Sequence, residues 1–382
     1  MRIGVFTDNF YPSVGGLEAS IDALSRAYIN LGHEVVVCCP KTKLPADDST
    51  FPYRVIRARA LKVAENDYFA FPRMDSNFKK QLKNEKFDLI HVHAVYPMSS
   101  YGIRLAKKTK TPLLCTCHTI LREAYYSAIK IRFLSRWIPS ILGRKLRNAT
   151  ALTCVGANIV DEVRSYGYKG IIHVQKNGNN PVTANTSKAL RDKFNHEQGL
   201  SDDEFVMHFM GRLVKYKGVQ MIVDAIEQLK EQGIKTTCFF VGKGSDLELF
   251  RKQVKDKGLE RYARFLGYVA EGEELDKLFS RSDLFVFPSY FDTDGLVVVE
   301  AAFCDIPSLV LKGTGPSERI TDAVNGYICD NSTEAFAAKI KEIYLNPKKR
   351  KEIGKNAHAQ LPNSWEDVAQ KYIDYVFNPK QA

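Results

Sequence analysis

The sequence predicts an α/β protein composed of two doubly wound domains. Short apolar runs alternate with longer segments of helical period. Most of these runs are continuously apolar, which is typical of parallel strands buried on both faces. The alternation is interrupted by a polar stretch after Gly178 and resumes near Leu200. With 382 residues, the chain has the length expected of two domains.

Seven strands are expected in the first half, with helices between most of them, for example at Leu17–Leu31 and Met98–Lys108. The strands are Ile3–Phe6, Val35–Cys39, Arg54–Arg57, Leu89–His93, Leu113–Thr116, Leu152–Val155 and Ile171–Val174. The stretch from Gly178 to about Leu200 is interpreted as a linker, because it begins with clustered asparagine, glycine and proline and continues as a polar segment.

The second half repeats the pattern, and three helices are expected to close the chain. Its strands are Val206–Met210, Cys238–Val241, Arg264–Gly267, Leu284–Pro288 and Ser308–Leu311. The last helix, Glu366–Phe377, follows Ser364, which is a suitable N-cap. Ligands of doubly wound sheets bind beyond the carboxyl ends of the strands, so a cleft between two such domains is the expected site.

Charge is distributed unevenly along the chain. The formal net charge is +11, with 27 basic and 14 acidic residues through Gly178 and 28 and 30 in the remainder. A basic half attracts anions such as phosphorylated ligands, nucleic acid or an anionic membrane. Six of the eight cysteines lie in apolar, strand-like runs, and no paired C-x-x-C motifs occur, which favours free core thiols over zinc ligation or a disulfide framework.

Targeting signals are not evident in the sequence. The apolar stretch at the N-terminus is too short for a secretion signal, and no run approaches the roughly 20 apolar residues that a spanning helix needs. The protein is therefore predicted to be cytoplasmic.

Two turns after predicted strands carry residues suited to phosphate. The common phosphate loop and the G-x-G-x-x-G fingerprint are absent. Gly15 and Gly16 instead precede the first helix, where backbone could approach an anion closely, although a simple tight turn is the alternative. In the second half, Gly211 follows a strand, and Arg212 and Lys217 follow the glycine. These two cations could neutralise a diphosphate without a metal, although alone they would suit a solvated basic loop.

A third turn, at residues 288–301, carries acids before an apolar helix. Asp292 lies at the end of a strand, and Gly295 begins the helix, so the amides of Leu296 and Val297 could hold a phosphate. Glu300 lies in an apolar run, where a carboxylate needs a polar partner. The Asp292–Asp294 segment matches the D-x-D metal motif, but its place late in a second α/β domain favours a strand-to-helix turn.

These motifs together resemble those of glycosyltransferase family 4, over nearly the whole chain. The matching segments are Gly15-Gly16, Gly32-His33-Glu34-Val35, His91-Val92-His93, Thr116-Cys117-His118-Thr119, Lys176-Asn177-Gly178, Gly211-Arg212, Lys217-Gly218, Val241-Gly242-Lys243-Gly244 and Asn325-Gly326-Tyr327. The family's acidic signature is two glutamates separated by seven residues. Glu300 matches the second, whereas the first is Asp292, and Thr293 and Asp294 replace the usual Gly-Phe.

The resemblance implies the GT-B fold, in which two Rossmann-like domains face each other across a cleft. Residues 1–178 would bind the acceptor, and residues 200–364 would bind a nucleotide-sugar. The closing helix, about 365–382, would pack back on the first domain. The reaction would be retaining transfer of a hexose, glucose or galactose from a UDP-sugar, with no metal or other cofactor required.

The resemblance also implies roles for individual residues. Arg212 and Lys217, with the amides after Gly295, would stabilise the departing diphosphate. Asp292 would hold hexose hydroxyls, and Glu300 would accept hydrogen bonds from the ribose. Backbone would approach the donor closely at four further glycines: Gly15, Gly16, Gly211 and Gly242.

Histidines of the first half have two interpretations. His118 follows a strand and would face the sugar, according to the family's T-x-H pattern, although a histidine after an apolar strand is more often structural. His91 and His93 lie two residues apart on a strand with no third ligand evident, so they are interpreted as structural or cleft-lining rather than as a metal pair.

A basic segment between residues 126 and 147 is the candidate membrane and acceptor surface. It contains no acid, and the residues assigned to the surface are Lys130, Arg132, Arg136, Trp137, Arg144 and Lys145. Four apolar residues share one helical face: Ile129, Phe133, Trp137 and Ile141. This pattern is typical of a helix on an anionic membrane, and an ordinary helix packed on its own sheet is the alternative.

The prediction is therefore a glycosyltransferase peripheral to the inner face of the cell membrane, with a diacylglycerol-type lipid as its acceptor. A cell-wall, capsule or exopolysaccharide glycan acceptor, with a UDP- or GDP-sugar donor, is the alternative. A nucleotide-sugar epimerase on the same fold is a further alternative. A nucleic-acid partner is not predicted, because only the charge suggests it.

Overall fold

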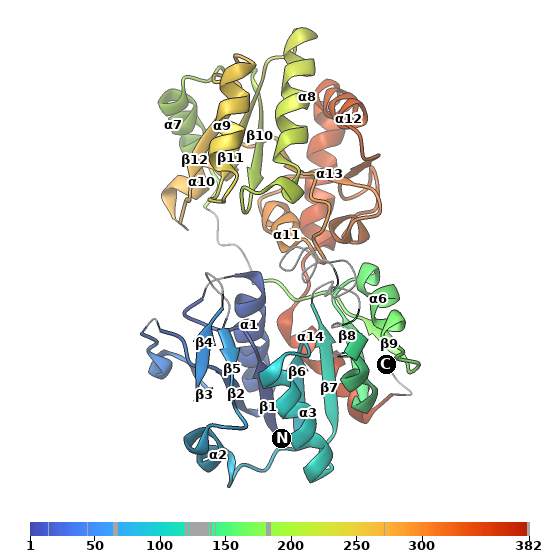
Figure 1. Ribbon diagram of the computed structural model, residues 1–382. Coiled ribbons are helices and arrows are strands. Elements are labelled where there is room, and N and C mark those ends of the chain that lie inside the picture. Colours follow the sequence, from blue (N-terminus) through green and yellow to red (C-terminus); the bar gives the residue numbers. More distant parts are fainter. Residues whose placement is uncertain are drawn as a thin grey trace. The chain divides into compact units, whose positions relative to one another are not determined.

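The protein consists of two compact units in the computed structural model, which describes residues 1–13, 15–43, 45–63, 68–118, 122, 137, 140–141, 143–180, 185–270 and 272–379. The first unit comprises Met1–Asn180 with Asn363–Ala382, and the second comprises Pro181–Pro362 (Figure 1). Each unit contains a parallel sheet with helices on both faces, as the sequence predicted. Each predicted strand is present, with ends within two residues of those expected.

The sheet of the first unit has seven strands in the order β3-β2-β1-β6-β7-β8-β9. In chain order they are β1 (Arg2–Thr7), β2 (Glu34–Pro40), β3 (Arg54–Ala58), β6 (Leu89–His93), β7 (Leu113–Cys117), β8 (Ala151–Cys154) and β9 (Ile172–Val174). Strand β1 pairs with both β2 and β6. From β1 the chain first adds β2 and β3 on one side and then adds β6 to β9 on the other. The carboxyl ends of β1 and β6 are therefore the topological switch point, where doubly wound sheets bind ligands.

Two apolar cores cover the faces of this sheet. Ile3 and Val5 face one core with α1 (Gly16–Asn30) and α14 (Trp365–Phe377), and Phe6 faces the other. That second core includes residues of α2 (Ser76–Leu82), α3 (Pro97–Thr109) and α6 (Val160–Ser165). Ser364 caps α14 as predicted, because its hydroxyl accepts the amide of Asp367 at 3.0 Å.

A small antiparallel hairpin follows β3 and was not predicted. Its strands are β4 (Ala60–Lys62) and β5 (Tyr68–Ala70). Three short 3-10 helices complete the described elements of the unit: η1 (Asp48–Thr50), η2 (Arg144–Asn148) and η3 (Ala157–Ile159).

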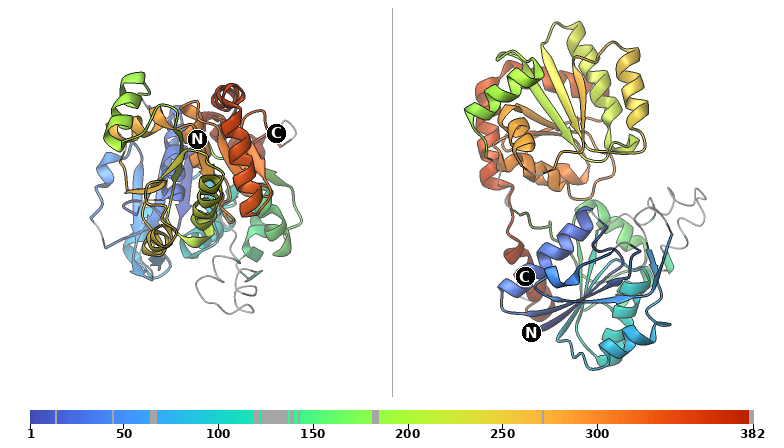
Figure 2. Two further views of the ribbon diagram at one scale, coloured as in Figure 1. Left: turned by 90° about the horizontal axis from the view of Figure 1, so that it is seen from above. Right: turned by 90° about the vertical axis from the view of Figure 1, so that its left-hand side faces the viewer.

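The sheet of the second unit has six strands in the order β12-β11-β10-β13-β14-β15. In chain order they are β10 (Phe205–Met210), β11 (Thr236–Val241), β12 (Ala263–Gly267), β13 (Leu284–Phe287), β14 (Ser308–Leu311) and β15 (Tyr327–Cys329). The elements between them are α7 (Lys188–Gln198), η4 (Lys215–Lys217), α8 (Val219–Glu231), α9 (Leu247–Asp256), α10 (Glu273–Arg281), α11 (Leu296–Phe303), η5 (Gly315–Arg319), α12 (Thr333–Leu345) and α13 (Pro347–Gln360). Helix α8 packs beside α9 and α12, whereas α7 packs on α10 and α11 on α13 (Figure 2).

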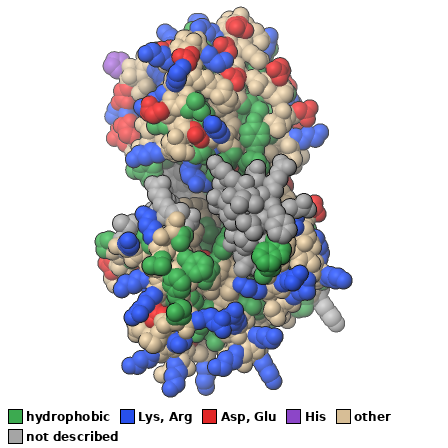
Figure 3. Space-filling view, viewed as in Figure 1, with side chains coloured by type: hydrophobic (Ala, Val, Ile, Leu, Met, Phe, Trp, Pro, Cys, Tyr) green, Lys and Arg blue, Asp and Glu red, His purple; other side chains and the backbone are tan. Residues whose placement is uncertain are grey.

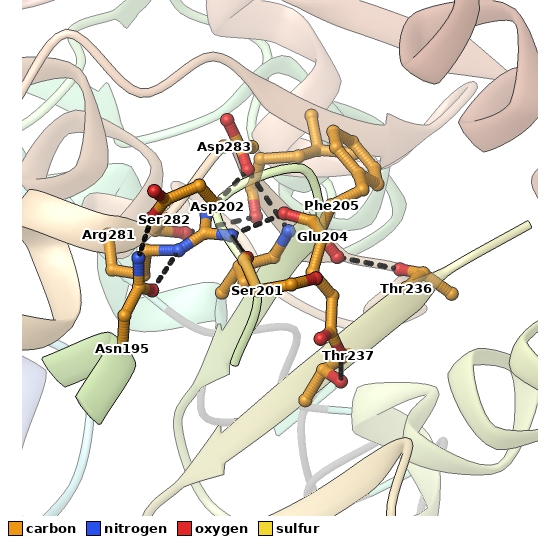
Figure 4. A network of polar contacts seen from close by, with 12 residues as sticks. Asn195, Ser201, Asp202, Glu204, Phe205, Thr236, Thr237, Arg281, Ser282 and Asp283 are labelled. Atoms are coloured by element: carbon orange, nitrogen blue, oxygen red, sulfur yellow. Dashed lines mark hydrogen bonds and ion pairs between the residues drawn. The ribbon is translucent and has the colours of Figure 1, made fainter. Parts of the chain in front are cut away.

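The interpretation of residues 178–200 as a linker was wrong, because Lys188–Gln198 form helix α7. The helix is polar and buries little apolar surface, chiefly Phe194, so its helical period was hidden in the sequence. It is fixed by Arg281, whose side chain is fully buried (Figure 4). The guanidinium of Arg281 donates to Asn195 Oδ1 of α7 at 2.6 Å, to Asp283 Oδ2 at 2.9 Å and to the carbonyl oxygen of Glu204.

The eight cysteines are free thiols, and all but Cys304 are buried, as the sequence predicted. Among the described residues, no helix combines the length and the apolar character that are needed to cross a bilayer.

Candidate active site

Two glycine turns meet at the carboxyl edge of the second sheet. Gly211 follows β10 and Gly242 follows the neighbouring β11, with φ of 152° and 138°. A Cβ on Gly242 would lie 1.9 Å from the carbonyl oxygen of Gly211, so only glycine permits this approach. The amide of Leu213 also donates to the carbonyl of Lys243 at 2.9 Å. Backbone contacts therefore hold the two turns together, and the neighbouring Arg212 is exposed.

Lys217 and Asp292 form an ion pair across the ends of two adjacent strands. Lys217 lies in η4 after β10, and Asp292 lies after β13, which pairs with β10. The ammonium contacts both carboxylate oxygens, at 2.7 and 2.6 Å. The side chains are 11% and 23% exposed. Burial lowers the pKa of Lys217, and Asp292 offsets part of that effect.

The backbone around this pair is locked. The amide of Tyr290 donates to the carbonyl of Tyr216 at 3.0 Å. Gly218 has φ of 75°, and a Cβ there would lie 2.1 Å from the carbonyl oxygen of Pro288. The segment that carries Lys217 therefore cannot shift away from the segment that carries Asp292 without breaking these contacts.

Tyr216 connects the two cations that the sequence singled out. Its hydroxyl accepts a hydrogen bond from Arg212 Nη2 at 2.5 Å, and Lys217 Nζ lies 5.8 Å from the centre of its ring. The ring contacts Phe291 edge to face at 6.1 Å. The contacts of Tyr216 were not predicted from the sequence. Its position between Arg212 and Lys217 was the one signal that could have indicated them.

The loop before α11 is fixed by a second buried ion pair. Asp294 Oδ1 accepts from Arg319 Nη2 at 2.5 Å and from its Nε at 2.8 Å, and both side chains are almost fully buried. Because Asp292 and Asp294 each have a cationic partner, this segment does not offer the two open carboxylates of a D-x-D metal site. The described part of the chain contains no group of three or more His, Cys, Asp or Glu side chains that could hold a metal ion.

Helix α11 begins directly after Gly295, its N-cap, which has φ of 71°. The amide of Val298 bonds to the carbonyl of Gly295 at 3.0 Å. Leu296 and Val297 carry the preceding amides, which have no acceptor within the helix. Glu300 is half-buried in the next turn. The structure therefore brings Lys217 and Asp292 into contact and places the start of α11 in the same loop as Asp292.

At the switch point of the first sheet, Asp8 caps α3. The carboxylate follows β1 and accepts the amide of Met98 at 2.7 Å and both the amide and the hydroxyl of Ser99, at 3.1 and 2.7 Å. Burial raises the pKa of Asp8 despite these bonds. Gly16 begins α1, and no atom outside its immediate neighbours lies within 4 Å of an added Cβ, so the space beside Gly16 is open.

Three histidines are stacked along β6 and the end of β7. His91 bonds to Thr116 Oγ1 at 2.7 Å and to Tyr28 Oη at 3.2 Å, which confirms a structural role. His93 Nδ1 lies 2.9 Å from His118 Nε2, and their rings are stacked at 5.2 Å. Burial lowers the pKa of His118 to about 4, so this imidazole is neutral at neutral pH. His118 therefore lies at the carboxyl edge of the sheet with His93 orienting its ring.

The basic segment is described only in part. Lys130, Arg132 and Arg136 lie outside the described residues. Trp137 is exposed, as is Arg144. Lys145 is directed into the unit instead: its ammonium donates to Ser100 Oγ at 2.7 Å, and burial lowers its pKa.

Two family models match the chain, one over each unit. The family model "Glycosyltransferase Family 4" matches residues 14–181, and "Glycosyl transferases group 1" matches residues 191–360. The chain is 26% identical to alpha-monoglucosyldiacylglycerol synthase of Acholeplasma laidlawii, over 99% of this chain and 96% of that protein. It is 22% identical to the protein of the same name from Streptococcus pneumoniae, over 91% and 79%.

Solved structures match the fold over its full length. The structure of HepE from Anabaena in complex with UDP superimposes with a TM-score of 0.78 at 18% identity, covering 99% of this chain and 100% of that one. The likeness shows the GT-B fold. The chain thus belongs to glycosyltransferase family 4, the retaining glycosyltransferases that use nucleotide-sugar donors on this fold.

Proposed function

We propose that the enzyme transfers a hexose, glucose or galactose, from a UDP-sugar to a diacylglycerol-type lipid at the cytoplasmic face of a membrane. The contact between Lys217 and Asp292 carries the donor side of this proposal, because it holds a cation for phosphate and an acid for sugar hydroxyls in one place. The acceptor is supported by the two relatives named alpha-monoglucosyldiacylglycerol synthase. UDP is supported by the ligand of HepE.

The leaving diphosphate would be stabilised by fixed positive groups. Arg212 and Lys217 supply two charges at the ends of neighbouring strands, and the amides of Leu296 and Val297 supply dipoles from α11. Because Lys217 is paired with Asp292 before the donor binds, its ammonium would exchange a carboxylate contact for a phosphate contact. Asp292 would then accept hydrogen bonds from the hexose, and Glu300 from the ribose.

Transfer would occur on one face of the sugar. The bond between the anomeric carbon and the phosphate oxygen breaks, and the acceptor hydroxyl oxygen bonds to the same face of that carbon. The acceptor proton passes to the departing phosphate oxygen, so atoms and charge balance without a metal or a covalent intermediate. The glycine turns at Gly211, Gly242 and Gly295 would let the backbone approach the donor.

The first unit would contribute groups to binding of the acceptor and the sugar. Neutral His118 can donate or accept one hydrogen bond to a sugar hydroxyl without adding charge. The open space beside Gly16 would admit a phosphate near the start of α1. Gly15 precedes this turn. Lysine and arginine side chains are dense over the first unit (Figure 3), which suits an anionic membrane surface.

The test is a matrix of UDP-glucose, UDP-galactose and GDP-mannose against vesicles that contain diacylglycerol, with products identified by mass spectrometry. A hexosylated diacylglycerol from a UDP-sugar, formed in the presence of EDTA, is expected. Release of nucleotide without glycolipid would contradict the lipid acceptor, and product on an added cell-envelope glycan would establish the alternative acceptor. A 2-epimerised sugar formed without acceptor would indicate an epimerase.

A further inference from the structure

The hairpin β4–β5 presents an apolar face to solvent. Leu61 and Phe69 lie opposite each other in the register, and Val63 follows on the same side, because side chains alternate along a strand. Leu61, Val63 and Phe69 are 63, 64 and 47% exposed, and nearby Met74 is 80% exposed. Scattered single apolar residues are ordinary on a protein surface, whereas neighbouring exposed apolar side chains such as Leu61, Val63 and Phe69 are candidates for an interaction site.

The hairpin is attached to the first unit by backbone hydrogen bonds and by its opposite face. Its opposite face packs on the domain through Ala70, which is buried, and through Ala60. The amide of Phe71 donates to the carbonyl of Arg59 at 2.7 Å. The amide of Arg59 in turn donates to buried Asp75 at 2.8 Å. The face with Ala60 and Ala70 packs on the core, so the opposite face, which carries Leu61 and Phe69, is directed to solvent. Leu61 and Phe69 therefore do not contribute to the core.

Basic residues outnumber acidic ones in the segment that carries the apolar face. From residue 59 to residue 83 the sequence has six lysines and arginines against three acids; Asp75 is buried, and Glu65 and Asp67 lie between the two strands in the sequence. Arg59, Lys62 and Arg73 are exposed; Arg59 shares the strand face of Leu61, whereas Lys62 lies at the edge of the other face. Figure 3 shows hydrophobic side chains over this region with lysine and arginine around them. Apolar side chains ringed by cations are complementary to an anionic membrane interface, which offers acyl chains and negative headgroups together.

The hairpin also lies at the functional edge of the first unit. It begins directly after the carboxyl end of β3, and β5 packs against β2 and α3. The same edge carries Gly16, Asp8 and His118. A bilayer seated on the hairpin would therefore lie beside the edge where the acceptor is expected.

We propose that the exposed face of hairpin β4–β5, with its surrounding cations, is a membrane-docking surface for anionic bilayers. As a site of lipid delivery it rests on the proposed lipid acceptor, but vesicle binding itself does not require that function. The surface is made of other residues than the basic segment at 126–147.

The experiment measures vesicle binding of the full chain by sedimentation, with equal parts phosphatidylglycerol and phosphatidylcholine and no sugar donor. The double variant Leu61→Ser/Phe69→Ser is expected to bind at least about tenfold more weakly than the unmodified chain. The matched control, Leu249→Ser/Leu345→Ser, changes two exposed leucines of the second unit and should bind as the unmodified chain does. Unchanged binding of the hairpin variant would overturn the proposal.

Two further measurements separate the alternatives. Thermal unfolding and UDP binding of the hairpin variant should match those of the unmodified chain, and a loss of either would show that these side chains support the fold instead. Sedimentation velocity without vesicles should show no change of oligomeric state, and dissociation of an oligomer by the variant would overturn the proposal in favour of a second copy. If the unmodified chain binds vesicles through the hairpin but glycosylates no lipid, the proposed function fails and the docking surface stands.

Discussion

Replacing Lys217 by methionine separates catalysis from stability. At 2.6 Å and an effective dielectric constant of about 20, the attraction between Lys217 and Asp292 is about 6 kcal/mol. The pKa of Lys217 is nevertheless lowered, because burial of the ammonium and the nearby charge of Arg212 together outweigh the effect of Asp292. Methionine keeps the apolar stem and removes the charge, and Asp292 remains accessible to water. The free energy of unfolding is therefore expected to fall by only about 1–2 kcal/mol.

The expected loss of activity is larger. If Lys217 stabilises charge on the departing diphosphate, kcat/KM should fall by about 100-fold or more, which is about 2.7 kcal/mol of transition-state stabilisation. Nucleotide release at several donor concentrations gives kcat and KM, and urea unfolding gives stability. Lys215→Met, at an exposed position of the same η4, is the control and should change neither. Equal losses of activity and stability in Lys217→Met would refute the reasoning, because Lys217 would then be structural.

Three further predictions concern other buried or paired groups. Tyr216→Phe removes the acceptor of the Arg212 hydrogen bond but keeps the ring, so KM for the donor should rise by about three- to tenfold with little change in thermal stability; an unchanged KM would show that Tyr216 does not position Arg212. Arg281→Met removes a fully buried guanidinium from Asn195, Asp283 and the carbonyl of Glu204, while Asp283 keeps its ion pair with Arg350; it should lower the free energy of unfolding by about 2–4 kcal/mol in urea titration. Burial lowers the pKa of His208 to about 3, so the unfolded chain binds one more proton between about pH 6.5 and pH 3, and stability falls as the pH falls through that window. His208→Phe should make urea midpoints at pH 7 and pH 5 more similar than in the unmodified chain, and an unchanged difference would contradict the assignment.

The strands and turns could be predicted because their signals are local. Continuously apolar runs end at Gly211 and at Pro288, and each end is followed by residues of chemical interest. The contact between Lys217 and Asp292 joins residues 75 positions apart, and it depends on β13 pairing with β10 on the side opposite β11. No local pattern encodes that strand order, so the two residues were assigned separate roles and their pairing was missed.

Elements with little apolar burial were missed for a different reason. Helix α7 has the end signals of a helix, because Ser187 is its N-cap and Gly199 ends it in the left-handed region. It has few apolar residues, however, so no apolar period of 3.6 residues is visible. It is stabilised by Arg281, which lies far along the sequence. The hairpin β4–β5 has strands of three residues each, which are too short to show the alternation of a strand.

The departures from the family's acidic signature form a consistent set. Asp294 occupies the position of the usual phenylalanine, and it is buried against Arg319. A phenylalanine there would leave that guanidinium buried without its carboxylate, so Asp294 and Arg319 are interdependent. This pair fixes the loop between β13 and α11, and the loop sets the position of Asp292. Lys217 is held on the other side by the bond between Tyr216 and Tyr290. With both backbones fixed, a glutamate in place of Asp292 would extend one methylene further toward the ammonium and would have to displace it. The shorter acid is therefore the one that suits this loop, and under the proposed function it would leave more room for the donor hexose.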